Sequence, residues 1–315
     1  MKYVFLLTAF LALVSCKNKD KDPDLSIHTE WEHNFQAISQ GGDTLYAAKS
    51  SEEILAKFEE KKAAYEVNPN NLDNLIWYGR FAAYTGDYRK AIEIYSQGLE
   101  DFPKESRLLR HRGHRYISVR EFDNAIADLS LAVKLIQGKE NMIEEDGMPN
   151  DKNIPVSTMH GNIYYHLGLA YYLNRNLPAA LEAYKKCLQT SNNPDNVVSA
   201  THWIYMIHRR MGRAEAAQNY LRNIHEDMNV IENQSYYKAC LFYKGLLDLE
   251  DVYDPSAEGT PTNSALKYAV GNWYLYNGNP DQAHGIFNEI ISGKDWASFG
   301  YIAAETDLAK PYTMR

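Results

Sequence analysis

The chain has 315 residues, and 45% of them are apolar, which is ample material for a folded core. Acidic residues outnumber basic ones by 41 to 33, giving a net charge of −8. This balance argues against general nucleic-acid binding, so no nucleic-acid partner is expected. Beyond the N-terminal segment, no apolar run reaches the length of a membrane span.

The chain opens with a lysine followed by an apolar run over residues 3–14. This run is too short to cross a bilayer, which takes about 20 apolar residues. A basic start, a short apolar run and small residues before a cut are typical of an export signal. With Leu13, Ser15 and Cys16 at the lipobox positions, residues 1–15 resemble a bacterial lipoprotein signal. The resemblance implies cleavage before Cys16 and acyl chains on its thiol and amino group; the alternative is an ordinary secretory signal.

Residues 17–24 read KNKDKDPD and contain no apolar side chain, so they predict an extended tether after the lipidated residue. Lys17 replaces the aspartate that tends to retain lipoproteins in the inner membrane, and by analogy it favours the outer membrane. The Lys/Asp-rich start is similar to that of Bacteroidota lipoproteins. We therefore expect a lipid-anchored protein on the periplasmic or surface side of the outer membrane. Within the segment of residues 16–49, we expect residues 31–46 to pack over the first helices.

A helix is predicted over residues 50–67, with Ser50 and Glu53 placed as a capping box. After it, glycine, alanine and proline recur at a spacing of 34 residues, for example at Gly79 and Gly113. The register defines five units, at about residues 72–105, 106–139, 161–194, 198–231 and 264–297. Small residues at positions 8 and 20 of a unit would let two helices approach closely, and large residues fill the space around them.

These residues resemble the tetratricopeptide repeat (TPR) family. The resemblance implies an all-α fold, an α-solenoid of antiparallel helix pairs with a right-handed superhelical stack over residues 50–310. Unit four departs from the pattern because it has Tyr205 at position 8, which predicts a splayed helix pair. Residues 232–250 predict one extra helix without a partner, and residues 296–309 predict a closing helix.

The 34-residue spacing breaks once, between Gly113 and Gly168, which are 55 residues apart. The excess lies in residues 140–160, which contain the acidic run at residues 144–146. Loops this long are usually functional or disordered. Two interpretations stay open: a solvated, tolerated insertion, or a flap beside the groove whose acidic run docks on basic residues and gates the groove or mimics a ligand.

In the family, the first helix of each unit lines the concave face of the stack. Carried over by position, the resemblance predicts a partner-binding groove rich in arginine and tyrosine. Its candidate residues are Arg80, Tyr84, Arg107, Arg110, His114, Tyr165, Tyr172, His202, Arg209, Tyr268 and Asn272. Such a groove suits an acidic or aromatic-rich peptide segment of a protein partner. The alternative is that the arginines pair with acids of the same stack, and we favour it for Arg112 and Arg115.

The lysine and asparagine positions of the known TPR carboxylate clamp are not reproduced, which argues against chaperone-tail binding of that type. No HExxH, CxxC, GxSxG or phosphate-loop motif occurs, so we expect neither an enzyme nor a cofactor. Arginines surround His111 and His114 and would repel a metal ion. Cys187 and Cys240 are expected to be buried free thiols.

The sequence therefore predicts a membrane-anchored TPR scaffold that binds a protein or peptide through its concave groove. Two alternatives stay open. One is an assembly scaffold for outer-membrane proteins, and the other is a lipoprotein that binds a glycan or small ligand through tyrosine and tryptophan side chains.

Overall fold

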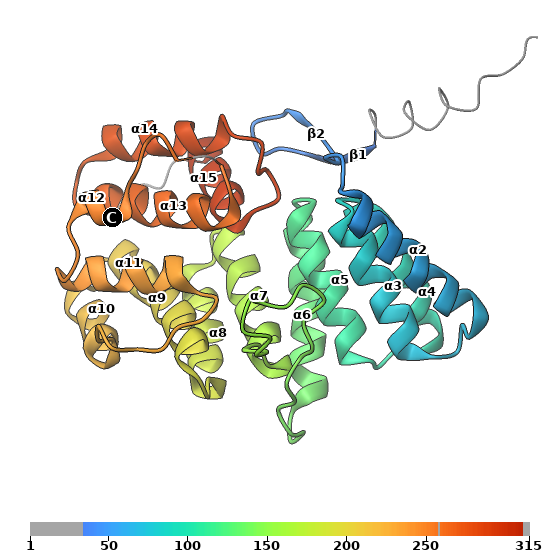
Figure 1. Ribbon diagram of the computed structural model, residues 1–315. Coiled ribbons are helices and arrows are strands. Elements are labelled where there is room, and N and C mark those ends of the chain that lie inside the picture. Colours follow the sequence, from blue (N-terminus) through green and yellow to red (C-terminus); the bar gives the residue numbers. More distant parts are fainter. Residues whose placement is uncertain (1–33, 258, 311–315) are drawn as a thin grey trace, which may run out of the picture.

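A computed structural model describes residues 34–257 and 259–310 of the chain (Figure 1). The predicted signal, Cys16 and the tether over residues 17–24 lie outside the described residues. Among the residues that are described, no helix combines the length and apolar character needed to cross a bilayer.

Antiparallel helix pairs dominate the structure, which confirms the all-α prediction. The first units are α2 (Glu52–Val67), α3 (Leu72–Tyr84) with α4 (Tyr88–Asp101), and α5 (Ser106–Ser118) with α6 (Phe122–Ile136). After the insertion come α7 (Met159–Leu173) with α8 (Leu177–Thr190), and α9 (Pro194–Arg210) with the short α10 (Ala214–Tyr220) and a 3₁₀ turn at Leu221–Asn223. Then follow α11 (Gln234–Lys244), α12 (Leu249–Val252), α13 (Pro261–Tyr276) with α14 (Pro280–Ile291), and α15 (Phe299–Ala309).

The glycine at position 8 of a unit is there because the paired helices touch. A Cβ atom at Gly79 would lie 2.3 Å from Cε1 of Tyr95, and one at Gly168 would lie 2.7 Å from the ring of Tyr184. Any side chain at these positions would collide with the second helix. In unit four, where Tyr205 takes this position, its ring instead stacks on Tyr243 of α11 with the ring centroids 4.3 Å apart.

Two local predictions are corrected. The N-cap of α2 is Ser51, whose side chain accepts a hydrogen bond from the backbone of Ile54, so the helix starts later than the proposed box at Ser50 and Glu53. The single helix expected over residues 232–250 is two helices, because Gly245 adopts the left-handed conformation (φ 73°) and ends α11. Glycine is the residue that takes this conformation without steric cost.

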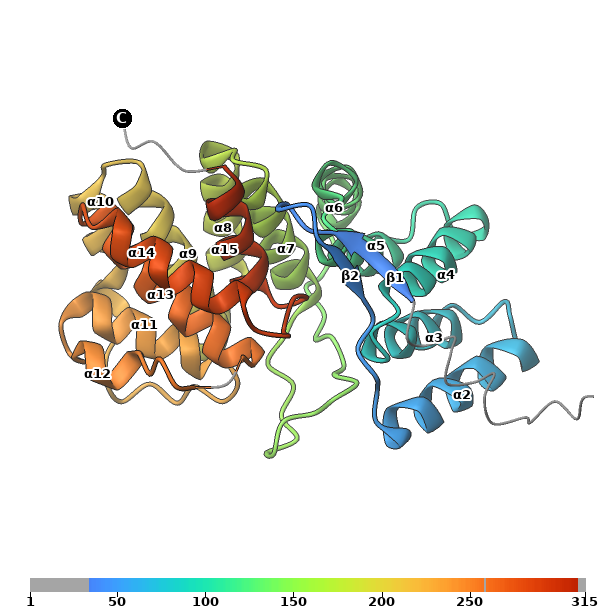
Figure 2. The same cartoon turned by 90° about the horizontal axis from the view of Figure 1, so that it is seen from above.

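A small β-hairpin precedes the helices and was not predicted. Strand β1 (Phe35–Ile38) pairs antiparallel with β2 (Thr44–Tyr46). Its inner residues Ala37 and Leu45 pack on Val119 at the end of α5, together with Trp296 near the C-terminus. The hairpin thus lies against α4 and α5, as expected, in the described part of residues 31–46, and it also joins these helices to the C-terminal helices (Figure 2).

The closing helix α15 connects the two ends of the stack. Glu305 of α15 accepts hydrogen bonds from Nε of Arg120, at 3.1 Å, and from the backbone of Gln40 in the hairpin, at 2.7 Å. Both Arg120 and Glu305 are buried. The C-terminal helices therefore fold back toward the first units instead of extending the stack away from them.

Candidate functional site

The insertion, residues 140–160, is the long loop between α6 and α7 (Figure 1), and it contacts the first helices of units one to three. At its base, the backbone of Glu144 donates to Ser157 at 3.0 Å and that of Met159 donates to Met142 at 2.8 Å. Farther along, Asn150 donates to Glu232, at 2.5 Å, before α11. The insertion is therefore an ordered strap with two antiparallel arms at its base.

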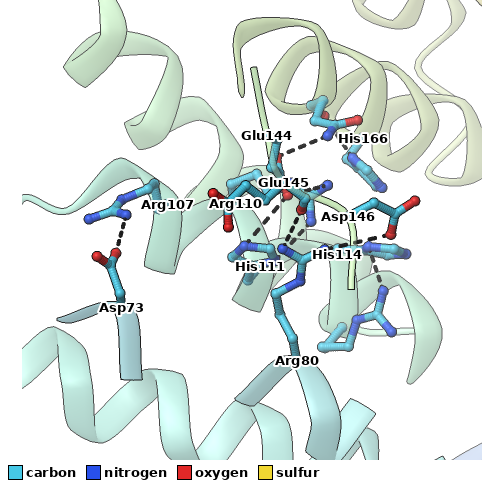
Figure 3. A network of polar contacts seen from close by, with 12 residues as sticks. Asp73, Arg80, Arg107, Arg110, His111, His114, Glu144, Glu145, Asp146 and His166 are labelled. Carbon is cyan, nitrogen blue, oxygen red and sulfur yellow. Dashed lines mark hydrogen bonds and ion pairs between the residues drawn. The ribbon is translucent and has the colours of Figure 1, made fainter. Parts of the chain in front are cut away.

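Beneath the strap is a cavity of about 170 Å³ that we call the basic cavity. Its cationic wall comes from α3 and α5, which place Arg80, Arg110 and Arg115 on one side of the space. Tyr84, Tyr95, His111 and His114 complete this wall. Figure 3 shows Arg80 and Arg110 directed toward the acidic run of the insertion.

Glu144 of the insertion lines the basic cavity and faces its cationic wall. Its carboxylate lies 3.1 Å from Nη2 of Arg110 and 3.6 Å from Nε2 of His111, and it accepts a hydrogen bond from Asn162 at 2.9 Å. Only 8% of its side chain is exposed. A carboxylate this deeply buried is stable because arginine and amide donors replace its hydration.

The next two residues of the insertion meet Arg80. Its Nη1 atom donates to the backbone carbonyl of Glu145 at 2.7 Å, and its Nη2 atom lies 4.0 Å from the carboxylate of Asp146. Gly147 then fits against two rings, since a Cβ atom there would lie 2.8 Å from Cε2 of Tyr84 and 2.9 Å from Cζ3 of Trp77. The first helices thus contact a carboxylate, a carbonyl, a carboxylate and a glycine in four successive residues.

Two arginine–histidine pairs on α5 belong to the cationic wall of the basic cavity. Arg110 donates to Nδ1 of His111 at 2.9 Å, and Arg115 donates to Nδ1 of His114 at 2.5 Å. Burial, followed by the nearby Arg110 and Arg115 charges, holds the pKa values of His111 and His114 well below the usual range. Both rings are therefore neutral near pH 7, so they orient the arginines and leave the positive charge in place.

The charges of the basic cavity come from different parts of the chain. Among the described residues, the carboxylates that line it all belong to the insertion, whereas its arginines all belong to helices. Burial lowers the pKa values of Arg110 and Arg115, because a desolvated guanidinium is costly. In addition, Nε of Arg110 is buried without a hydrogen-bond partner. Without the insertion, three arginines would face one another on the concave side.

The structure brings four of the predicted groove residues together: Arg80, Tyr84, Arg110 and His114 line the basic cavity. Tyr165 lines a neighbouring cavity of about 210 Å³, whose wall shares Ser157 and Asn162 with the basic cavity. There its hydroxyl contacts that of Tyr236 at 2.8 Å and accepts a hydrogen bond from Trp203 at 3.0 Å. The two cavities are therefore adjacent beneath the same strap.

The predicted groove residues in the C-terminal half are a correction. Tyr172, His202, Tyr268 and Asn272 are at most 2% exposed, so they cannot meet a partner. Unit five covers Tyr172, since the hydroxyls of Tyr172 and Tyr268 are 2.6 Å apart and Asn272 donates to Tyr172 at 3.0 Å. His202 is covered by α11, whose Tyr236 ring stacks on it with the ring centroids 4.8 Å apart. Fold-back of the last helices turns this part of the predicted concave surface into core.

Arg107 and Arg209 also have partners within the chain. Arg107 lies 2.6 Å from Asp73 on the neighbouring unit, outside the basic cavity. Arg209 donates to Asn277 at 2.7 Å, and its guanidinium lies 4.3 Å from the ring centroid of Tyr276. The candidate groove is thus confined to units one to three.

Sequence reasoning missed His111 and misjudged Arg115. Arg112 does pair with its own stack, donating to both oxygens of Asp128 at 2.7 and 2.8 Å. Arg115 instead lines the basic cavity. The missed signal was helical spacing, because residues 107, 110, 111, 114 and 115 follow the i, i+3, i+4, i+7, i+8 pattern of a single helix face.

The described residues offer neither a metal site nor a reactive cysteine. Within residues 34–257 and 259–310, no group of three His, Cys, Asp or Glu side chains is arranged to hold a metal ion. Cys187 and Cys240 are free and buried, as predicted. Burial raises the pKa of the Cys187 thiol to about 12, so it is not a reactive thiolate near neutral pH.

Comparisons with known proteins agree with the repeat. Residues 161–194, unit three, match the family described as tetratricopeptide repeat. A stretch of 188 residues, 60% of this chain, is 23% identical to BBSome complex member BBS4 of Bos taurus, and the match spans 30% of that protein.

Two solved structures are among the matches. One is a tetratricopeptide repeat protein from Parabacteroides merdae, 18% identical, with 81% of this chain and 92% of that chain covered and a TM-score of 0.47. The other is YrrB, described as a TPR protein with an unusual peptide-binding site, 15% identical, with 75% and 92% covered and a TM-score of 0.42. Unit three therefore matches a tetratricopeptide repeat, and the other helix pairs repeat its two-helix arrangement along the described chain.

Proposed function

We propose that this protein is a non-catalytic scaffold that binds an acidic peptide segment of a protein partner in the basic cavity of units one to three. One observation carries the proposal: α3 and α5 direct Arg80, Arg110 and Arg115 into one cavity, and the chain's own acidic segment lies there. Arginine's fork suits carboxylates, and arginine and tyrosine are typical hot-spot residues of interfaces.

Charge and position both support a peptide partner. The two adjacent cavities lie along the first helices of the repeats, where an extended segment would run across several units. The protein carries a net charge of −8, so the cluster of buried arginines makes this cavity locally positive in a protein that is negative overall. Local positive potential in a cleft attracts anionic ligands and speeds their association.

Anchoring is the second part of the proposal. Cleavage before Cys16 and acylation of that residue would hold the scaffold on a membrane, and we place it on the outer membrane of a bacterial envelope. Several acyl chains at one terminus anchor a protein stably, where one chain is marginal. Metabolic labelling with a fatty acid tests this directly. Wild-type protein should incorporate the label and sediment with membranes, and Cys16→Ser should do neither.

Binding is tested with a labelled hexaglutamate peptide and a hexaglutamine control, followed by fluorescence anisotropy. We expect hexaglutamate to bind and hexaglutamine not to bind. Raising the ionic strength from about 0.05 to about 0.5 M should weaken binding several-fold, because salt screens the attraction. Arg80→Gln should weaken it at least about tenfold, as expected for a lost charge-assisted contact.

Arg107→Gln is the matched control, because Arg107 also lies on α5 and loses the same charge but pairs with Asp73 outside the basic cavity. It should change the affinity less than about twofold, as expected for a screened charge at the rim. Equal losses in the two variants, or an affinity that does not change with salt, would remove the basic cavity as the binding site.

A small-ligand function is the second candidate, and the cavity beside Tyr165 favours it. Tyr236, Phe299, Asn196 and Ser199 line that cavity, which combines aromatic and amide groups as sugar sites do. Trp203 cannot report on such binding by direct contact, since it is 1% exposed. Isothermal titration with mono- and disaccharides separates the candidates: sugar binding that survives Arg80→Gln would favour this second function.

A further inference from the structure

The acidic run of the insertion is seated in the basic cavity as a bound peptide would be. It contributes a carboxylate, a carbonyl, a carboxylate and a glycine in that order, at residues 144–147. Arg110 meets the first group, Arg80 the second and third, and the Tyr84 and Trp77 rings the fourth. Each contact comes from a first helix of the repeat, the surface with which TPR stacks hold extended ligands.

The basic cavity has room and charge beyond what this segment supplies. A space of about 170 Å³ remains with Glu144 in place. Nε of Arg110 is buried without a hydrogen-bond partner, and Arg115 has no carboxylate partner among the described residues. Asp146 reaches Arg80 only at 4.0 Å. A segment that placed its acids slightly deeper would satisfy groups that the insertion leaves unsatisfied.

Apolar packing of the insertion against the helices is limited. Met142, Ile143, Met148 and Ile154 are 48–61% exposed, whereas Val156 is buried. Polar contacts at residues 144–147 therefore supply much of what holds the strap over the basic cavity. Another chain can replace such contacts with equivalent ones. The net free energy of each contact is small, because it replaces hydrogen bonds with water.

We infer that residues 144–147, Glu-Glu-Asp-Gly, are an internal copy of the ligand, and that the partner is an extended acidic segment with carboxylates two residues apart, followed by glycine, which displaces them. This inference rests on the proposed function and adds both the recognition pattern and its regulation. The internal copy competes with the partner for the basic cavity. The apparent affinity for the partner therefore equals the affinity of the open cavity multiplied by the fraction of molecules in which the cavity is open.

The test uses a labelled peptide with the insertion's own sequence, Met-Ile-Glu-Glu-Asp-Gly-Met, titrated into wild-type protein and into Glu144→Gln. Glutamine keeps the shape of the side chain and its contact with Asn162 but removes the charge that faces Arg110. The variant should bind the peptide at least about tenfold more tightly than wild type, because its internal copy competes less well.

Asp151→Asn is the matched control. It removes one negative charge from the same insertion, at an exposed residue that does not line the basic cavity and lies outside residues 144–147. Its affinity should equal that of wild type. A peptide with glutamine at its first glutamate should bind Glu144→Gln at least about tenfold more weakly than the native peptide does. Thermal unfolding of each variant shows whether it is folded.

The outcomes separate the inference from the function on which it rests. If wild type, Glu144→Gln and Asp151→Asn bind the peptide equally, the internal copy is disproved while acidic-peptide binding stands. The same holds if hexaglutamate binds Glu144→Gln and the native peptide does not. If neither peptide binds any folded variant, the proposed function and the inference both fail.

Discussion

The two halves of the concave side use the same residue types, but different parts of the chain cover them. In the C-terminal half, Arg175 and Arg210 converge on Asp307 of α15, with Nη1 to Oδ1 distances of 2.5 and 2.9 Å. In the N-terminal half, Arg80 and Arg110 meet the insertion. A helix whose Ile302, Ala303 and Ala304 are at most 1% exposed covers the first, and a strap with exposed apolar side chains covers the second.

This difference shows that an arginine on a repeat's inner face is not by itself a binding residue. Asp307 cannot leave Arg210 unless α15 leaves the main core cluster, which would expose apolar surface in several units. Glu144 can leave Arg110 by movement of the insertion alone. The same chemistry is therefore structural in one half and exchangeable in the other.

The largest expected effect comes from removing the C-terminal charge. Burial alone would raise the pKa of Asp307, but Arg210 and Arg175 outweigh it and lower that pKa. Asp307→Asn leaves Arg210 buried without its anion and should lower the free energy of unfolding by roughly 3–5 kcal/mol. Glu144→Gln should cost only about 1–2 kcal/mol, because water reaches Arg110 once the insertion moves. Urea denaturation of both variants measures the difference, and equal losses would contradict the distinction between the halves.

Acidification should destabilise the protein through its buried histidines. Burial, followed by Arg110 or Arg115, lowers the pKa values of His111, His114 and His166, and burial lowers that of His202 to about 3. The unfolded chain takes up these protons near pH 6.5 and the folded chain does not. Stability is therefore full above about pH 6.5 and falls below it, by about 1.4 kcal/mol per histidine per pH unit.

Urea denaturation between pH 7.5 and 5.5 tests this sign, for wild type and for His225→Gln, which changes an exposed histidine. Both proteins should lose stability together as the pH falls. Stability that rises or stays level over this range would show that the buried histidines are not held neutral.

A smaller loss is expected from the contact that joins the halves. Glu305→Gln removes the anion that accepts from Arg120 and from the hairpin, while Arg120 still donates to the carbonyl of Ser118 at 2.6 Å. The free energy of unfolding should fall by about 1.5–3 kcal/mol. Loss of a cooperative single transition would further show that this contact couples the units. An unchanged midpoint would mean that the hairpin and α15 are held by packing alone.

The smallest global effect is expected at Gly147. Gly147→Ala places a Cβ atom against the Tyr84 and Trp77 rings and should lift the tip of the insertion. The midpoint of unfolding should barely change, but trypsin should cleave after Lys152 faster than in wild type, because a detached loop is a better protease substrate. Gly285→Ala is the control, because a side chain at Gly285 meets open space. Gly138→Ala would not serve, because the φ of Gly138 is 73° and any side chain is strained there.

The sequence predicted the features that repeat and missed those that occur once. Glycine and alanine at fixed positions imply paired helices wherever they recur, and the charge of residues 144–146 suggested docking on the arginines. The hairpin has strands of only four and three residues, too short to produce a periodic signal. Burial of Tyr172, Tyr268 and Asn272 depends on how α13 packs on the earlier units, and that packing joins residues about 100 positions apart, as between Tyr172 of α7 and Asn272 of α13.

Hydrogen exchange with and without saturating peptide tests the distinction between the halves most directly. On addition of Met-Ile-Glu-Glu-Asp-Gly-Met to wild-type protein, the amide of Glu144, which donates to Ser157, should exchange faster, and the amides of α15 should not change. Unchanged or slower exchange at Glu144 with the peptide bound, or faster exchange across α15, would contradict a displaceable insertion over the basic cavity and a fixed helix over the other half.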